Sequence, residues 1–135
     1  MNKHKIFSLP VRVYFQDTDA GGVVYHASYL NFMERARTEW MRTHGYSNAG
    51  LMKEFGMVFV VRSIKLDYLK PALLDDLLDV TAQIKDIGRS RISLLQSVQR
   101  GAELLTEAEV HLVCVSLENF KPVAVPEVLR EQWKD

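Results

Sequence analysis

Residues 14–29 read YFQDTDAGGVVYHASY, and the rest of the chain can be placed around them. An apolar strand over residues 11–15 is predicted to lead into this segment, and an amphipathic helix over residues 28–42 to follow it. Between strand and helix lie two aspartates, a pair of glycines and a histidine. A helix N-terminus carries unpaired N–H groups and a partial positive charge. The segment therefore places ionisable side chains where a developing oxyanion would be stabilised.

Residues 28–42 carry apolar side chains at helical spacing, at Tyr29, Met33, Ala36 and Trp40. Ser28 is placed to cap the start of this helix, and Gly45 is placed to end it. The charged residues of the helix are spaced for i,i+3 and i,i+4 ion pairs, which predicts a solvent-exposed charged face formed by Glu34, Arg35, Arg37 and Glu39. A second, short helix is predicted over residues 47–55, ended by Gly56.

From residue 57 the hydrophobic pattern changes to the alternation of β-strands. Four strands joined by hairpin-compatible turns are predicted at residues 57–68, 78–85, 90–99 and 104–117, followed by a short charged helix over 127–134. One face of the first of these strands is expected to hold Val58, Val60, Arg62, Ile64, Leu66 and Tyr68. A long helix with one apolar face needs a sheet to cover it. The predicted fold class is therefore α+β, with about five antiparallel strands in one domain over residues 1–135.

The string DTDAGGVVYH at residues 17–26, followed by Tyr29 and by ERARTE at 34–39, resembles the hot-dog-fold acyl-CoA thioesterases. The resembled group is related to 4-hydroxybenzoyl-CoA thioesterase, and the closest match is with the Tol–Pal-associated (YbgC-type) acyl-CoA thioesterases. The resemblance implies a hot-dog fold, an antiparallel sheet wrapped on one long central helix. It further implies hydrolysis of acyl-CoA to free acid and CoA, in a dimer or homotetramer with active sites at the subunit interface.

The chemistry of thioester hydrolysis needs a nucleophile, or a base that activates water, and donors for the oxyanion. Asp19 is the candidate for the first role, because it lies beyond the strand and beside Gly21 and Gly22, which let a substrate approach the backbone closely. The resemblance also makes Asp19 the catalytic residue, as nucleophile or as general base. In the alternative, Asp17 and Asp19 only form a turn and cap; Asp17 is in any case expected to orient the turn.

The oxyanion donor is expected to be a backbone N–H at the start of the long helix, around Tyr25 and His26, and the resemblance points to His26. The His26 side chain is a candidate to polarise the carbonyl or orient water, or else only packs near the helix start. Coenzyme A carries phosphates, which arginine binds well. Arg89 and Arg91, beside Gly88, form the best local basic cluster, although each is individually typical of a solvated surface.

Two other functions remain open at this point. One is a hot-dog dehydratase, and the other is a non-catalytic module that binds acyl thioesters or an acyl carrier protein. In dehydratases a histidine usually pairs with an acid across the dimer, and here Asp19 and His26 share one loop. The presence of both residues argues against a purely non-catalytic module.

Composition limits the remaining possibilities. The formal net charge is zero, so there is no global electrostatic case for nucleic acid as a partner. Cys114, the single cysteine, lies in an apolar run and is expected to be a buried core thiol. The other histidines, His4, His44 and His111, lack metal-ligand spacing, so neither a metal nor another cofactor is expected. No secretory signal or membrane span is recognised, and the expected location is the cytoplasm.

Overall fold

A computed structural model describes residues 5–133, in which the predicted order of one strand, two helices and four strands is confirmed. The elements are, in order, β1 (Phe7–Arg12), the 3-10 turn η1 (Phe15–Asp17), α1 (Ser28–Thr43), α2 (Asn48–Phe55), β2 (Met57–Tyr68), β3 (Leu77–Ile87), β4 (Arg91–Arg100), β5 (Glu103–Ser116) and α3 (Glu127–Gln132). The predicted end of the last helix, at residue 134, lies outside the described residues.

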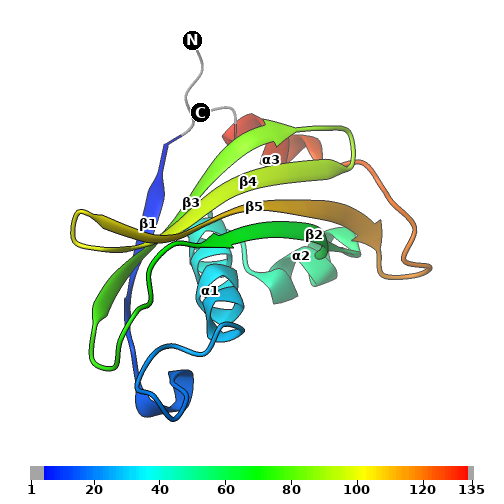
Figure 1. Ribbon diagram of the computed structural model, residues 1–135. Coiled ribbons are helices and arrows are strands. Elements are labelled where there is room, and N and C mark those ends of the chain that lie inside the picture. The colour runs from blue at the N-terminus through cyan, green and yellow to red at the C-terminus, as the bar shows by residue number, and fades with distance from the viewer. Residues whose placement is uncertain (1–4, 134–135) are drawn as a thin grey trace.

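The five strands form one antiparallel sheet in the order β1-β3-β4-β5-β2. The sheet curves around α1, which lies along its concave side (Figure 1). This is the predicted hot-dog fold. One expectation is wrong: β2 does not form a hairpin with β3, because it pairs with β5 at the far edge of the sheet. The connection from β2 to β3, residues 69–76, therefore has to cross the end of the sheet.

The first strand lies earlier than the predicted residues 11–15. It occupies the sheet edge at Phe7–Arg12, where Pro10 is tolerated because an edge strand has a free hydrogen-bonding side. Val13 keeps two backbone hydrogen bonds beyond the strand, but the amide of Tyr14 donates to the Asp17 carboxylate over 2.8 Å. This bond closes the η1 turn. The side chain of Asp17 therefore ends the extended segment before residue 15, to which the hydrophobic pattern had predicted the strand to continue.

The single alternation expected along β2 is also wrong. A β-bulge between Val61 and Ser63 shifts the pairing with β5, and the inward face changes parity there. Before the bulge Met57 is buried and Phe59 packs on the core, whereas after it Ile64 and Leu66 do so. Arg62 sits at the irregular position and is exposed.

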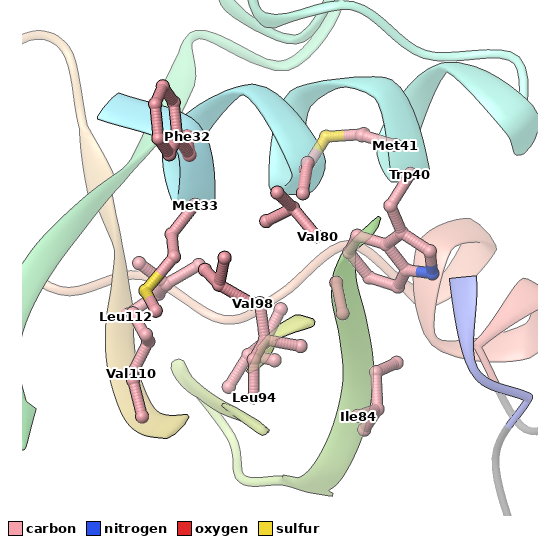
Figure 2. Packing of buried hydrophobic residues seen from close by; sticks show 14 of the residues in the cluster. Phe32, Met33, Trp40, Met41, Val80, Ile84, Leu94, Val98, Val110 and Leu112 are labelled. Carbon is pink, nitrogen blue, oxygen red and sulfur yellow. The ribbon is translucent and has the colours of Figure 1, made fainter. Parts of the chain in front are cut away.

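The core lies between α1 and the concave face of the sheet. In Figure 2, Met33 and Trp40 point from α1 toward the strands, where they meet residues such as Val80, Leu94 and Val110. The alternation predicted for β3, β4 and β5 is confirmed by this buried layer. Cys114 is fully buried as expected, and burial raises the pKa of its thiol to about 11. The thiol is therefore protonated at neutral pH and is not an activated nucleophile.

Two details of α1 differ from the predictions. The N-cap residue is Ala27, and Ser28 is the first helical residue, without a side-chain cap. Arg37 does not lie on a solvated charged face: its Nη1 donates to Gln96 Oε1 over 2.9 Å at the helix–sheet interface, and burial lowers its pKa. Gln96 is itself held by the carbonyls of Met33 and Thr81. Gly45 ends α1 at a φ of 88°, a left-handed conformation that glycine adopts without strain.

Candidate active site

Asp19 lies in a tight turn between η1 and α1. Its amide donates to the Val23 carbonyl (3.0 Å), and its carbonyl accepts from the Gly22 amide (3.1 Å). Its carboxylate atom Oδ1 accepts from the Gly21 amide (2.9 Å). Gly22 has a φ of 79°, which strongly favours glycine at this position. The turn therefore fixes the Asp19 side chain, and its other carboxylate oxygen has no hydrogen bond within residues 5–133.

The β2–β3 connection, residues 69–76, which we call the strap, holds this turn in place. The Val24 amide donates to the Ala72 carbonyl (2.9 Å), and the Leu74 amide donates to the Gly22 carbonyl (3.1 Å). Val23 also forms a β-bridge with Leu73. The strap thus runs beside the turn like an added strand, on the path that the crossing from β2 to β3 requires.

The two candidate oxyanion donors differ in the structure. The Tyr25 amide already donates to the Asp17 carbonyl over 2.8 Å, so it is not free to bind a substrate. The His26 amide has no acceptor in the described part of the chain. His26 directly precedes the N-cap of α1, so its N–H lies close to the positive end of the helix dipole. The geometry therefore favours His26 over Tyr25 as the backbone donor.

The side chains of Asp19, Tyr25 and His26 are all exposed. The Tyr25 and His26 rings lie 4.3 Å apart at an angle of 45°. Asp17 is half-buried and its Oδ2 is engaged by the Tyr14 amide, so the turn-orienting role expected for Asp17 has a structural basis. Of the two aspartates, Asp19 is the one with an exposed carboxylate.

Tyr68 connects this loop to the sheet, and Tyr29 connects α1 to the strap. The Tyr68 hydroxyl, at the end of β2, donates to the His26 carbonyl over 2.7 Å. The Tyr29 hydroxyl accepts from the Ala72 amide over 3.0 Å, and the two rings lie 5.3 Å apart. Burial is the main cause that raises the pKa of each tyrosine, so both hydroxyls stay protonated at neutral pH. The sequence offered no sign of this role for Tyr68, which it placed only as the last residue of a strand.

Arg89 and Arg91 lie far from Asp19 in the same chain. They flank the turn between β3 and β4, whereas the Asp19 loop packs where β3 begins. Because β3 covers 11 residues, the two ends are separated by roughly 30 Å at a strand rise of about 3.4 Å per residue. Figure 1 shows η1 and the β3–β4 turn at opposite ends of the sheet. One chain alone therefore does not bring the arginines to the Asp19 loop.

Two surface hollows lie away from this loop's exposed groups. One, of about 440 Å³, is on the outer face of the sheet and includes Thr81, Leu95 and Ser97. The other, of about 290 Å³, lies beside β1 and includes Tyr14 and Asp17. Neither is lined by Asp19 or His26.

Within residues 5–133, no three or more His, Cys, Asp or Glu side chains are grouped to hold a metal ion. In the same part of the chain, no helix combines the length and the apolar character that a membrane span requires.

Comparison with known proteins gives consistent matches over nearly the whole chain. The model of the thioesterase-like superfamily matches residues 13–133. The acyl-CoA thioesterase YbgC of Haemophilus influenzae is 46% identical over 92% of this chain and 91% of its own length. The YbgC acyl-CoA thioesterase of Helicobacter pylori is 35% identical over 89% of this chain and 94% of its own length.

Solved structures show the same fold. A probable thioesterase from Bartonella henselae superposes with a TM-score of 0.87 at 34% identity, covering 90% of this chain and all of that one. A 1,4-dihydroxy-2-naphthoyl-CoA thioesterase from Synechocystis superposes with a TM-score of 0.89 at 25% identity, covering 97% of both chains. The Synechocystis protein is described by a particular acyl group and the other three are not, so the shared fold does not by itself select one acyl substrate.

Proposed function

Because this chain belongs to the thioesterase-like superfamily, we propose that it is an acyl-CoA thioesterase that hydrolyses its substrate with Asp19 and the backbone amide of His26. The observation that carries the proposal is the pairing, in one loop, of an exposed carboxylate with an unengaged amide at a helix N-terminus. The 46% identity to an acyl-CoA thioesterase over almost the full length supports the substrate class.

Asp19 supplies the group that starts the reaction. As a general base, its carboxylate takes a proton from water while the water oxygen bonds to the thioester carbonyl carbon. As a nucleophile, a carboxylate oxygen bonds to that carbon directly, and the resulting anhydride is then hydrolysed by water. In both routes the C–S bond breaks, the thiolate of CoA leaves and takes up a proton, and the acid is released. The free second oxygen of Asp19 serves either route.

The His26 amide supplies the complementary charge. When the carbonyl carbon becomes tetrahedral, its oxygen gains negative charge, and an N–H at the positive end of α1 stabilises that charge. The donor is backbone, so its position depends on how the peptide is held and not on the side chain. The exposed imidazole of His26 is available beside it to orient water or the thioester.

The proposal extends to a homo-oligomer. β2 is an edge strand with Val60 36% and Val61 46% exposed, whereas the other edge, β1, contains Pro10, which has no N–H to donate. Pairing through β2 is therefore the better route to a dimer. A second copy would also give Arg89 and Arg91 a role, as ligands for the phosphates of CoA whose acyl end lies at the partner's loop.

Three further parts of the proposal rest on the sequence and on its resemblance. They are an acyl carrier protein as an alternative carrier of the acyl group, a location in the cytoplasm and a link to the Tol–Pal system. None of them affects the chemistry at Asp19.

The proposal is tested by replacing Asp19 with asparagine, which keeps the shape of the side chain and removes its basicity. We expect kcat for thiol release to fall by about a hundredfold to ten-thousandfold, the range for loss of a positioned acid–base group. The fold should be retained, because asparagine Oδ1 still accepts from the Gly21 amide. The measurement is steady-state thiol release over a panel of acyl-CoAs, which also identifies the preferred acyl group.

Asp17→Asn is the matched control, since it makes the same chemical change two residues away. Weakening the bond from the Tyr14 amide should reduce the free energy of unfolding by about 1 kcal/mol, as for the loss of a capping bond. Its kcat should stay near that of the wild type. If Asp17→Asn is inactive and Asp19→Asn turns over normally, the assignment of the catalytic carboxylate is wrong.

A further inference from the structure

The residue that carries the proposed oxyanion donor is held on both sides of its Cα atom. The Tyr25 carbonyl, which shares a peptide group with the His26 amide, accepts from the Ser28 amide over 2.8 Å. The Tyr68 hydroxyl donates to the carbonyl of His26 over 2.7 Å, across 42 positions of sequence. The His26 carbonyl belongs to the following peptide group, which is joined to that of the His26 amide through the His26 Cα atom. With the first of these peptide groups held by Ser28 and the second by Tyr68, rotation about the two backbone bonds at Cα is restricted. Together the two hydrogen bonds therefore restrain the direction in which the His26 N–H points.

Tyr68 is itself fixed by a closed set of contacts. Its ring packs edge-on against the Tyr29 ring, at 5.3 Å and 69°. The Tyr29 hydroxyl accepts from the Ala72 amide, and the Ala72 carbonyl accepts from the Val24 amide. Ala72 is fully buried, and both of its peptide groups are used. The contacts thus run from α1 to the strap, from the strap to the loop, and from the loop back to β2.

We propose that Tyr68 is a positioning residue of the thioesterase site, whose hydroxyl aims the His26 amide at the oxyanion. The inference rests on the proposed function, because it takes the His26 amide as the donor. Tyr68 acts only through the His26 peptide and makes no contact with reacting atoms in this role. The hydrogen bond from the His26 amide to the substrate oxygen strengthens as the transition state forms. Loss of the Tyr68 hydroxyl, which aligns this amide, should therefore lower kcat and leave KM almost unchanged.

The alternative role for Tyr68 is contact with the acyl chain, because half of its surface is exposed. The two roles make different predictions. A residue of the acyl pocket affects the binding of long acyl chains more than short ones, through apolar area. A positioning residue affects all thioesters alike, since every substrate develops the same oxyanion.

The test is Tyr68→Phe, which removes the hydroxyl and keeps the ring contact with Tyr29. Loss of one aligning hydrogen bond should lower kcat about five- to tenfold, with KM within about twofold, for a short and a long acyl-CoA alike. Tyr46→Phe is the control, since it makes the same change beyond the C-terminal end of α1. The Tyr46 hydroxyl has no hydrogen bond in the described residues, and its ring packs on Phe55. This variant should match the wild type.

Two kinetic outcomes would overturn the proposal. An unchanged kcat would show that the bond is not needed to orient the amide. A rise in KM that grows with acyl length would show that Tyr68 lines the acyl pocket instead. Failure of Tyr68→Phe to fold would also count against it, because the hydroxyl would then serve the stability of the whole domain.

Amide hydrogen exchange gives a readout that does not depend on activity. In Tyr68→Phe we expect faster exchange in a peptide covering residues 24–30 and unchanged exchange in β4. Equal acceleration in both segments would indicate general destabilisation and contradict a positioning role. If Asp19→Asn proves fully active, the proposed function fails, but the exchange experiment still reports whether Tyr68 orders the His26 peptide.

Discussion

The end of the sheet where β3 begins and the end where β3 finishes differ in what holds their connecting segments. At the first end, backbone hydrogen bonds join the Asp19 turn to the strap, and the Tyr68 hydroxyl joins β2 to the loop at His26. At the second, α3 closes the structure with apolar contacts. The Trp133 ring lies 5.1 Å from that of Trp40 and 5.8 Å from that of Phe59, and Leu129 is fully buried.

The first end also carries a cluster of ion pairs. Arg100 Nη1 lies 2.7 Å from Asp76 Oδ2, and Arg100 Nη2 lies 2.8 Å from Glu103 Oε1. Lys70 adds a contact of 3.1 Å to Glu103. Asp76 also accepts from the Leu73 amide, so the cluster ties β4 to the strap. Charged and polar groups thus fix the segment against which the Asp19 turn docks.

If the Asp19 loop is the active site, as proposed, the difference separates the end of the domain that carries the chemistry from the end that is closed by apolar packing. A catalytic end has to leave a carboxylate and an amide open to the substrate, so it cannot bury them under aromatic rings. Directional hydrogen bonds and ion pairs hold such a loop without covering it. The opposite end has no such requirement, and large apolar side chains there contribute most per residue to the free energy of unfolding.

Removing Trp133 should give the largest effect on stability. Trp133→Ala deletes a side chain that is 1% exposed, and the loss of packing should lower the free energy of unfolding by about 3–5 kcal/mol. The kcat of the protein that remains folded should be unchanged, because Trp133 packs near the C-terminal half of α1 and the proposed site lies at the N-terminus of that helix. Urea denaturation at fixed protein concentration measures the free energy of unfolding, and thiol release measures kcat.

Phe15→Ala is the comparison at the other end. Phe15 in η1 is 80% exposed, so deleting its ring should change the free energy of unfolding by less than about 0.5 kcal/mol. If the two alanine variants lose similar stability, the contrast between the ends is wrong.

Much of this organisation could be predicted from the sequence, because it depends on local periodicity. The helical spacing of Met33 and Trp40 and the alternation along β3 depend only on nearby residues, and both predictions hold. The turn at Gly22 was also visible, as a glycine pair between an acidic segment and a helix.

The other features of the fold and the site depend on contacts between residues that are distant in the sequence, and hydrophobic periodicity does not report such contacts. β2 pairs with β5 and not with β3, the next strand in the sequence. This pairing follows from closing the sheet around α1 and not from the hydrophobic pattern of either strand. The occupation of the Tyr25 amide by the Asp17 carbonyl depends on the path of the loop. Tyr68 reaches His26 because the end of β2 lies beside the start of α1, although the two residues are 42 positions apart in the sequence.

Arg89 and Arg91 extend the comparison, because they lie at the end of the sheet opposite the proposed active site. Replacing both with alanine should raise KM for acyl-CoA about tenfold with little change in kcat, as expected for lost contacts to charged phosphates. An acyl-pantetheine, which lacks the nucleotide phosphates, should be affected little. Equal losses of KM for both substrates would mean that the arginines do not bind those phosphates.

Mixed oligomers test whether the arginines act across subunits. Asp19→Asn is combined with Arg89→Ala/Arg91→Ala by co-expression, and activity is measured well below KM. If the arginines serve the partner's site, about a quarter of all sites in a random mixture of dimers regain both features. Activity should then exceed that of either variant alone, and sedimentation should show dimers or tetramers. A mixture no more active than its parents would contradict the shared site.

The smallest effect concerns pH and the ion pairs beside the strap. Hydrogen bonds from Arg100 and then Lys70 are the main causes that hold the pKa of Glu103 below its usual range. Near that pKa, the unfolded chain binds a proton more readily than the folded one, so the contribution of Glu103 to stability is complete above the ordinary glutamate pKa of about 4.3 and is lost as pH falls.

Glu103→Gln should therefore lower Tm at pH 7 by at most a few degrees, since the side chain is partly exposed to solvent. The difference from wild type should narrow below about pH 4, where the wild-type carboxylate also becomes protonated. Glu118→Gln is the control, because Glu118 is exposed and its carboxylate forms no ion pair within residues 5–133. The measurement is the Tm of the wild type, Glu103→Gln and Glu118→Gln from pH 7 to below about pH 4. A difference that widens as pH falls would mean that the Glu103 charge opposes folding, and that the ion pairs do not secure the strap.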